Sequence, residues 1–238
     1  CKTRPDRLVS LSKKLKLELN LIEMRVMQDY FRDLGRDPTD CEVKIFAARW
    51  SEHCGHKTFK AKLIIDGVEK LPLFERITET AQKYFGNEVV SAFKDNSGVV
   101  VFFEGFAICF KVETHNSPSA LEPYGGAATG TGGVIRDILG TGQGADVIIS
   151  TDIFCFAPPD LDSSELPEGC KHPDYLQRKV VAGVRDYGNR MGIPTNNGSV
   201  HYHKDFRAKP TVIVGAGGIM PIERAEKGDP REGDLVLV

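Results

Sequence analysis

The sequence predicts an α+β fold that begins with a pair of helices. Helix-like and strand-like segments alternate along the chain, a pattern that also occurs in parallel α/β proteins. Two β-rich runs at 99–103 and 106–112, however, are separated only by Glu104 and Gly105, which indicates an antiparallel hairpin with a tight turn. Because hairpins are present, we expect an α+β layer and not a purely parallel sheet.

Capping residues and apolar periodicity predict the two N-terminal helices. Asn20 with Glu23, and Thr39 with Glu42, each have the spacing of a capping box. We expect the second helix to run towards Gly55 and the two helices to form a hairpin. The apolar residues at steps of three and four are Met24, Met27, Phe31 and Leu34 in the first helix, and Val43, Phe46, Ala47 and Trp50 in the second.

The next elements are bounded by turn residues. Residues 61–65 are predicted as a strand that ends at the Asp66-Gly67 turn, and 74–85 as a helix before a turn at 95–98. The glycine-rich segment 125–144 predicts a loop that leads into a short helix, where the spacing is helical at Val134, Ile135, Ile138 and Leu139.

A strand, an exposed insertion and a long helix are predicted next. Residues 147–156 are β-rich, whereas 158–173 mix polar residues and prolines without periodicity. Asp174 and Gln177 are expected to cap the long helix, and strands are expected near Val200 and at 211–214. The helix positions predicted to face a core are Leu176, Val180, Val184, Tyr187 and Met191.

Composition excludes several classes of protein. Lysine and arginine total 31 against 33 aspartate and glutamate, so no basic excess predicts a nucleic-acid or membrane partner. No apolar run is long enough to span a bilayer, and the six cysteines show no CxxC pairing. With no signal peptide, these features predict a cytoplasmic protein that binds a small molecule. A start at Cys1 instead of methionine, and a β-branched end at Val238, predict a piece of a longer protein.

A first group of chemically active side chains lies at 50–56, at the end of the second helix. His53 could act there as an acid or base, because the helix C-terminus favours imidazolium. The alternatives are that His53 only caps the helix, or that His53, Cys54 and His56 bind zinc. Zinc is disfavoured, because a structural site needs four ligands and no second cluster of suitable spacing exists.

A second group follows the strand at 106–112. Alternation in an extended chain places Lys111, Glu113 and His115 on one face, where a cation, an acid and a base meet. Glu113 could hold Mg²⁺ while Lys111 contacts a phosphate of a metal-bound nucleotide. The alternative is an exposed Lys–Glu pair without function.

A third group is the glycine-rich segment 123–137. Its glycines could let the backbone approach a phosphate, with Arg136 and Asp137 beside substrate and metal, or they could serve close packing. The segment lacks the Walker pattern, and 140–145, which fits G-x-G-x-x-A, does not follow a strand as a Rossmann loop does. His201 and His203 are expected to share a strand face, with no functional role assigned.

Together, 50–54, 111–118 and 125–137 resemble the phosphoribosylformylglycinamidine synthase family, the ATP-dependent amidating enzymes of purine biosynthesis. The resemblance covers nearly the whole chain. It implies a helical linker at 1–58, then at 59–222 a subdomain like the N-terminal domain of aminoimidazole ribonucleotide synthetase, and the start of the next subdomain at 223–238. In that subdomain we expect a mixed sheet with helices on one face, and pairing with a sister half through the sheets.

The resemblance also implies roles for individual residues. His53 and His115 would be catalytic, with His115 as the acid/base group. Lys111 and His56 would contact ATP. Glu113 and Asp137 would bind Mg²⁺, and the residues that contact the substrate would be Thr114, His115, Asn116, Ser117 and Arg136.

The implied reaction converts formylglycinamide ribonucleotide to its amidine. ATP phosphorylates the amide oxygen, and ammonia from a fused or separate glutamine amidotransferase displaces phosphate. The second half of the synthetase is a further expected partner, and we expect this chain alone to be inactive. Two alternatives stay open: another ATP-using relative, such as aminoimidazole ribonucleotide synthetase or selenophosphate synthetase, and a catalytically silent half kept for assembly.

Overall fold

The computed structural model describes residues 4–235, with His53 and Cys54 described by their backbone only. The chain divides into two units, Cys1–Lys83 and Tyr84–Val238. No helix within the described residues has the length and the apolar character that a membrane crossing requires.

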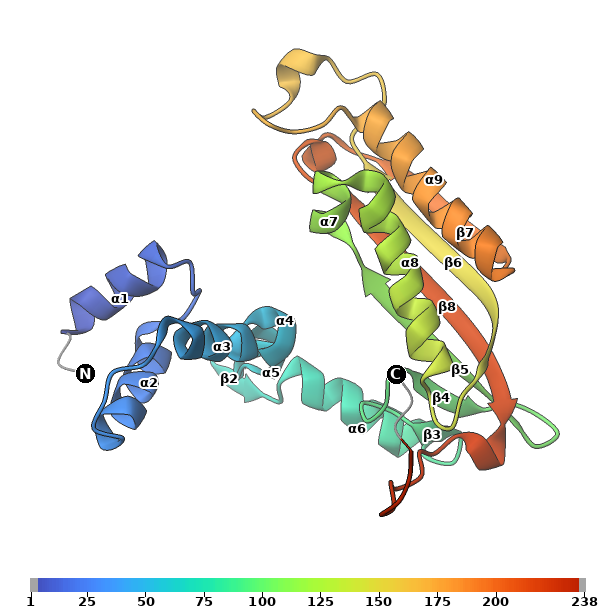
Figure 1. Cartoon of the computed structure of the whole chain (residues 1–238), viewed down its shortest axis with the longest axis horizontal. Coiled ribbons are helices and arrows are strands. Elements are labelled where there is room, and N and C mark those ends of the chain that lie inside the picture. The colour runs from blue at the N-terminus through green and yellow to red at the C-terminus, as the bar shows by residue number, and fades with distance from the viewer. Residues whose placement is uncertain (1–3, 236–238) are drawn as a thin grey trace. The chain divides into compact units, whose positions relative to one another are not determined.

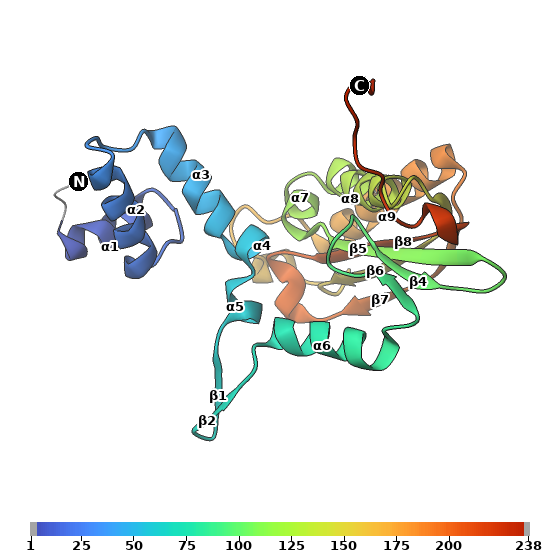
Figure 2. The same ribbon diagram turned by 90° about the horizontal axis from the view of Figure 1, so that it is seen from below.

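The first unit is mainly helical (Figure 2). Both predicted capping boxes are present, at Asn20–Glu23 and Thr39–Glu42. The elements are α1 (Pro5–Lys14), α2 (Leu21–Asp33), α3 (Asp40–Trp50), α4 (Glu52–Gly55), α5 (Lys57–Lys60), β1 (Leu63–Ile65), β2 (Val68–Lys70) and α6 (Leu73–Phe85). Helix α1 was not predicted, although Pro5 at its first turn is a recognised helix start.

The core of this unit confirms most of the predicted helix faces. Met24, Met27 and Phe31 are buried, and the Phe31 and Phe46 rings lie 6.0 Å apart in an edge-to-face arrangement. Two expectations were wrong. Leu34 is exposed because it is the C-cap of α2. The second helix ends at Trp50, because Ser51 adopts an extended conformation and separates α3 from α4.

The second unit contains a sheet of six strands in the order β3-β4-β5-β8-β6-β7. The strands are β3 (Val89–Ser91), β4 (Gly98–Val101), β5 (Phe106–Thr114), β6 (Asp146–Phe156), β7 (Thr195–Tyr202) and β8 (Thr211–Pro221). The predicted hairpin of β4 and β5 is present, and β8 pairs antiparallel with both β5 and β6. Only β6 and β7 pair in parallel, so the sheet is mixed and the predicted α+β class is confirmed.

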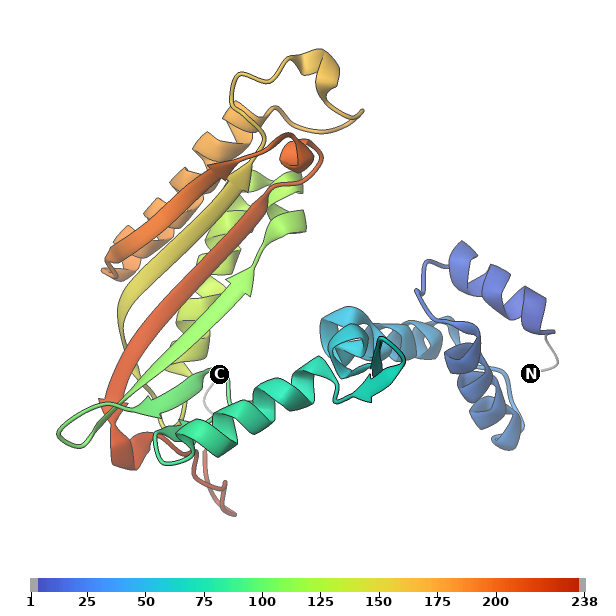
Figure 3. The same cartoon turned by 180° about the vertical axis from the view of Figure 1, so that it is seen from behind.

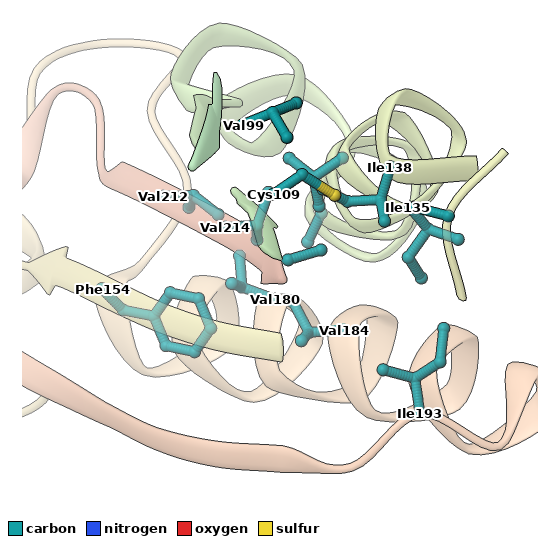
Figure 4. Packing of buried hydrophobic residues seen from close by; sticks show 14 of the residues in the cluster. Val99, Cys109, Ile135, Ile138, Phe154, Val180, Val184, Ile193, Val212 and Val214 are labelled. Carbon is teal, nitrogen blue, oxygen red and sulfur yellow. The ribbon is translucent and has the colours of Figure 1, made fainter. Parts of the chain in front are cut away.

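Helices of this unit cover one face of the sheet (Figure 1). They are α7 (Asn116–Leu121), α8 (Pro123–Leu139) and α9 (Pro173–Met191). The short helices η1 (Ser163–Glu165), η2 (Lys204–Arg207) and η3 (Ile222–Arg224) lie before α9, between β7 and β8, and after β8. Between α8, α9 and the sheet, the side chains of Ile135, Val180 and Val214 are at most 1% exposed; Figure 4 shows this core.

The opposite face of the sheet is apolar and open within this unit (Figure 3). On β5, buried Ala107 and Cys109 alternate with Phe106 and Phe110, which are 41% and 44% exposed. Strand alternation places these two phenylalanines, together with Val112, on the face away from α8. This is the surface through which the sheet was expected to pair.

Four further expectations about this unit were wrong. The first part of the glycine-rich segment is not a loop, because helix α8 begins at Pro123 and includes the glycines from Gly125 to Gly133. The cap of α9 is His172, whose side chain accepts a hydrogen bond from the Asp174 backbone, and Met191 at the other end is 47% exposed. His203 lies beyond β7, as the cap of η2, and does not share a strand face with His201.

Candidate functional site

The candidate site is centred on Lys111, in the last part of β5. Its ammonium group lies 3.0 Å from a carboxylate oxygen of Asp137 and 3.3 Å from one of Glu113. Glu113 is two residues further along the same strand, whereas Asp137 comes from the C-terminal turn of α8, which packs on this face. Two elements distant in sequence therefore bring a cation and two carboxylates together, as the strand alternation predicts for Lys111 and Glu113.

The carboxylates stabilise the charge on Lys111. Burial of the lysine disfavours its charge, but hydrogen bonds to Asp137 and then to Glu113 outweigh this and raise its pKa. The three side chains are only partly covered, with exposed fractions of 28% for Lys111, 41% for Glu113 and 30% for Asp137. The charge of Lys111 is thus stabilised, and the group is open to a ligand.

The same two carboxylates fit a magnesium ion. Mg²⁺ in proteins is bound by one or two carboxylates together with water and substrate phosphates, and does not need a full protein cage. Glu113 and Asp137 offer these oxygens around one point, marked by the ammonium of Lys111. Within the described residues no cluster of three or more histidine, cysteine, aspartate or glutamate residues could hold a metal, so any ion here would need oxygens from water or phosphate.

His115 follows directly after β5 and lies beneath α8. Its backbone N–H donates to the carbonyl of Val212 at 2.8 Å, which ties the end of β5 to β8. The imidazole packs against Gly130, where an added Cβ would lie only 2.9 Å from the ring. Its Nδ1 is buried without a hydrogen-bond partner among the described residues. The ring is therefore fixed in place by packing and has a nitrogen free for a further partner.

The glycines of α8 serve close packing, which was one of the two functions considered for them. An added Cβ at Gly126 would collide with the backbone of Pro118 in α7, and one at Gly132 would lie 2.7 Å from the ring of Tyr187 in α9. These contacts, with the one at Gly130, let α8 lie against α7, His115 and α9. The helix thereby carries Asp137 to Lys111 without forming a phosphate loop.

The remaining predicted substrate residues differ in their surroundings. Asn116 accepts a hydrogen bond from the Val212 backbone at 2.8 Å, so its carbonyl oxygen is already used. Ser117 is exposed and lies 3.5 Å from the ammonium of Lys209, and Arg136 is exposed on α8 beside Asp137. Strand alternation places Thr114 on the opposite face of the sheet from Glu113. The structure thus brings together Lys111, Glu113 and Asp137, but not Thr114.

His53 and His56 lie in the other unit, in and after α4. The side chain of His53 is outside the described part of the chain, so both its catalytic and its capping interpretations stay predictions. His56 is exposed and has a left-handed backbone, φ 50°, which ends α4. That conformation is uncommon for a residue other than glycine.

One ionisable residue that the sequence reasoning missed is Asp152, in the middle of β6. It is 6% exposed, and burial raises its pKa to about 6, although a hydrogen bond from Thr195 acts in the other direction. The available signal was a single carboxylate within the apolar run 147–156. Asp152 lines a cavity beside α9 and is not among the residues around Lys111.

Two family models match the chain. Residues 8–57 match the formylglycinamide ribonucleotide amidotransferase linker domain. Residues 94–220 match the AIR synthase related protein, N-terminal domain. The first match contains His53 and His56, and the second contains the group around Lys111.

Similar proteins of known name are subunits of one synthase. The chain is 39% identical over 237 residues to the phosphoribosylformylglycinamidine synthase subunit PurL of Thermoplasma acidophilum, covering 98% of this chain and 28% of that protein. It is 36% identical over 194 residues to the PurL of Thermus thermophilus, covering 82% of this chain and 23% of that protein. The chain thus spans about a quarter of the length of these relatives.

Solved structures show the same similarity. T. maritima PurL complexed with ATP superposes with a TM-score of 0.57 at 30% identity, over 84% of this chain and 27% of that one. T. maritima PurL complexed with FGAR gives a TM-score of 0.56 at 30% identity, over 84% and 26% of the two chains.

Proposed function

Because the chain belongs to the family of AIR synthase related proteins, we propose that it is part of an ATP-dependent synthetase that converts formylglycinamide ribonucleotide to formylglycinamidine ribonucleotide in purine biosynthesis, in the cytoplasm. The PurL relatives carry the name of this synthase, and T. maritima PurL was solved with ATP and with FGAR. The observation that carries the proposal is the position of Lys111 between Glu113 and Asp137, 3.3 and 3.0 Å away.

In this proposal Lys111 binds the nucleotide. A phosphate group that enters the site competes with two carboxylates for the ammonium, which is a compact, mobile charge on a flexible stem. Glu113 and Asp137 would then be free to hold Mg²⁺, which supplies charge neutralisation on the transferred phosphoryl group. Arg136 lies beside Asp137 and would bind the anionic part of the substrate.

His115 is proposed to exchange a proton at the substrate amide. In the reaction the amide oxygen takes the terminal phosphoryl group of ATP, ammonia adds to the amide carbon, and phosphate leaves with that oxygen. The nitrogen gained from ammonia loses protons as the amidine forms. An imidazole is suited to accept one of them, and the ring of His115 is fixed in position by its contact with Gly130.

Further partners follow from this reaction. Ammonia would come from a glutamine amidotransferase domain or subunit. One related solved structure is named PurLQS from Thermotoga maritima, and this name includes more than PurL alone. The second half of the synthetase would complete the site, so the isolated chain should be inactive. The family matches at 8–57 and 94–220 support a division into a linker at 1–58, a subdomain at 59–222 and the start of a next one at 223–238.

The test is amidine formation by the full-length protein, with formylglycinamide ribonucleotide, ATP, Mg²⁺ and ammonium as donor. Lys111→Met is expected to raise the KM for ATP strongly, because it removes the cation that meets the phosphate. Lys62→Met is the control, since that lysine forms an exposed pair with Glu69 in the first unit. No amidine from the wild-type protein, together with ATP-dependent turnover of a different ribonucleotide, would favour another member of the superfamily. Binding of ATP without any turnover would favour a silent half.

A further inference from the structure

A cavity that Lys111 does not line lies between the C-terminal half of α9 and the strands β6 and β7. Figures 1 and 3 show how these three elements are arranged. The volume of the cavity is about 570 Å³, within the range of small-molecule sites in proteins. The apolar part of the wall comes from Val181 and Val184 of α9, Phe154 of β6, and Ile193, and the polar residues Asn189, Asn197 and Ser199 line it as well. The cavity is open to solvent, so a small molecule can enter it.

Asp152 is an acidic residue in the lining of this cavity. The residue is 6% exposed, and its Oδ1 has no hydrogen-bond partner among the described residues. Its Oδ2 is reached only at 3.5 Å by the hydroxyl of Thr195, which also lies 3.0 Å from the hydroxyl of Ser150. A buried carboxylate normally accepts several hydrogen bonds, so this one has unused acceptor positions on both oxygens.

No cation of the cavity wall satisfies Asp152. Among the described lining residues Arg185 is the only other ionisable one. Its guanidinium is engaged by Asp186, with nitrogen–oxygen distances of 2.7 and 2.8 Å, and Asp186 is held in turn by the Tyr124 hydroxyl at 3.0 Å. The charge of Arg185 is therefore compensated by Asp186, whereas the negative charge of Asp152 has no compensating cation in the described part of the cavity lining.

From these observations we propose that the cavity binds a small molecule with a planar or apolar body and a cationic amidinium or guanidinium head, which donates its N–H groups to Asp152. The negative charge of Asp152 attracts such a head, and its unfilled acceptor positions match the N–H donors that the head carries. The apolar walls at Phe154, Val184 and Ile193 suit the body of the molecule. This site uses none of the residues assigned to the synthetase reaction, so it does not depend on that assignment.

Calorimetry or ligand-observed NMR with the full-length protein would test the proposal, with benzamidine as the probe. Benzylamine presents a single ammonium and should bind more weakly, while benzoate should not bind. Asp152→Asn should weaken benzamidine at least about tenfold, because it removes the charge and one acceptor oxygen. The matched control is Asp146→Asn, which makes the same change at an exposed position on the same strand, outside the cavity.

A pH series on the wild-type protein keeps the test independent of the variant. Benzamidine stays charged between pH 5 and pH 7.5, and hydrogen bonds from Arg185 and Tyr124 hold the pKa of Asp186 below its ordinary value, so the group expected to titrate is Asp152. Protonation of its carboxylate should weaken binding about tenfold at pH 5. Absence of saturable binding, equal binding of benzoate, or benzamidine binding that Asp152→Asn leaves unchanged would each overturn the proposal.

Discussion

Replacement of Asp152 by asparagine is expected to stabilise β6, and increasingly so as the pH rises. In the folded protein the pKa of this carboxyl is raised to about 6 from its ordinary 3.8. The folded state therefore holds the proton more tightly than the unfolded chain does. Its contribution to stability is full below the ordinary pKa and is lost as the pH rises through 6, because the folded protein must then hold an unpaired buried charge.

The size of the effect follows from the shift. The difference between about 6 and 3.8 corresponds to about 3 kcal/mol at 1.36 kcal/mol for each pH unit. This is an upper limit for the gain at pH 8, where the carboxyl is ionised in both states. Asparagine has nearly the same shape and carries no charge, so it avoids this cost while it keeps a carbonyl oxygen near Thr195.

Hydrogen exchange of the β6 amides, 146–156, would measure the effect without requiring the whole protein to unfold in one step. The ratio of exchange rates between wild type and variant at one pH reports the difference in opening free energy. At pH 8 the variant should exchange slower by up to roughly a hundredfold, and at pH 4 by only a few-fold. Asp146→Asn is the control and should change neither. A ratio that stays constant from pH 4 to pH 8, or faster exchange in Asp152→Asn at pH 8, would refute the reasoning.

Three other expectations concern the proposed synthetase and the sheet. Glu113→Gln and Asp137→Asn should each raise the Mg²⁺ concentration needed for half-maximal turnover and slow turnover by at least about tenfold, since each removes an anionic metal ligand. A magnesium titration that is unchanged in both variants would contradict the metal assignment. His115→Ala should lower kcat with ammonia as donor, whereas His56→Ala should mainly alter the KM for ATP, and near-normal kcat in the first would contradict its role. The isolated chain should self-associate through the open sheet face, because about 25 cal/mol is gained for each Å² of apolar surface that is covered. In sedimentation experiments at micromolar concentration, Phe110→Lys should shift the chain towards monomer. A monomeric wild-type chain would argue against association through this face.

Local signals predicted much of the fold. Capping boxes at Asn20 and Thr39, the turn at Glu104 and Gly105, and alternation along β5 each act over a few residues, so they can be recognised without the tertiary structure. The same alternation brought Lys111 and Glu113 together in advance. Strand alternation could not predict that Asp137 contacts Lys111, because that contact depends on the packing of α8 against β5.

The failures have separate physical causes. Glycines normally disfavour helices, so 125–133 was predicted as a loop, and the helix forms because Gly126, Gly130 and Gly132 pack closely against neighbouring elements. His172 was overlooked as the cap of α9 because a histidine cap is less common than an aspartate cap. Asp152 was not noticed because a single acid in an apolar strand becomes informative only when its burial and its missing partners are known.

The glycine content of α8 also has a consequence for folding. Its sequence PYGGAATGTGGVIRDIL contains five glycines, each of which disfavours a helix by about 1 kcal/mol relative to alanine, so the isolated segment should be unstructured. The helix can form only once α7, α9 and the end of β5 are present to pack against it. Asp137 therefore reaches Lys111 late in folding, and any local unfolding that releases α8 separates the two. The ion pair of Lys111 and Asp137 therefore depends on the packing of the whole layer of helices.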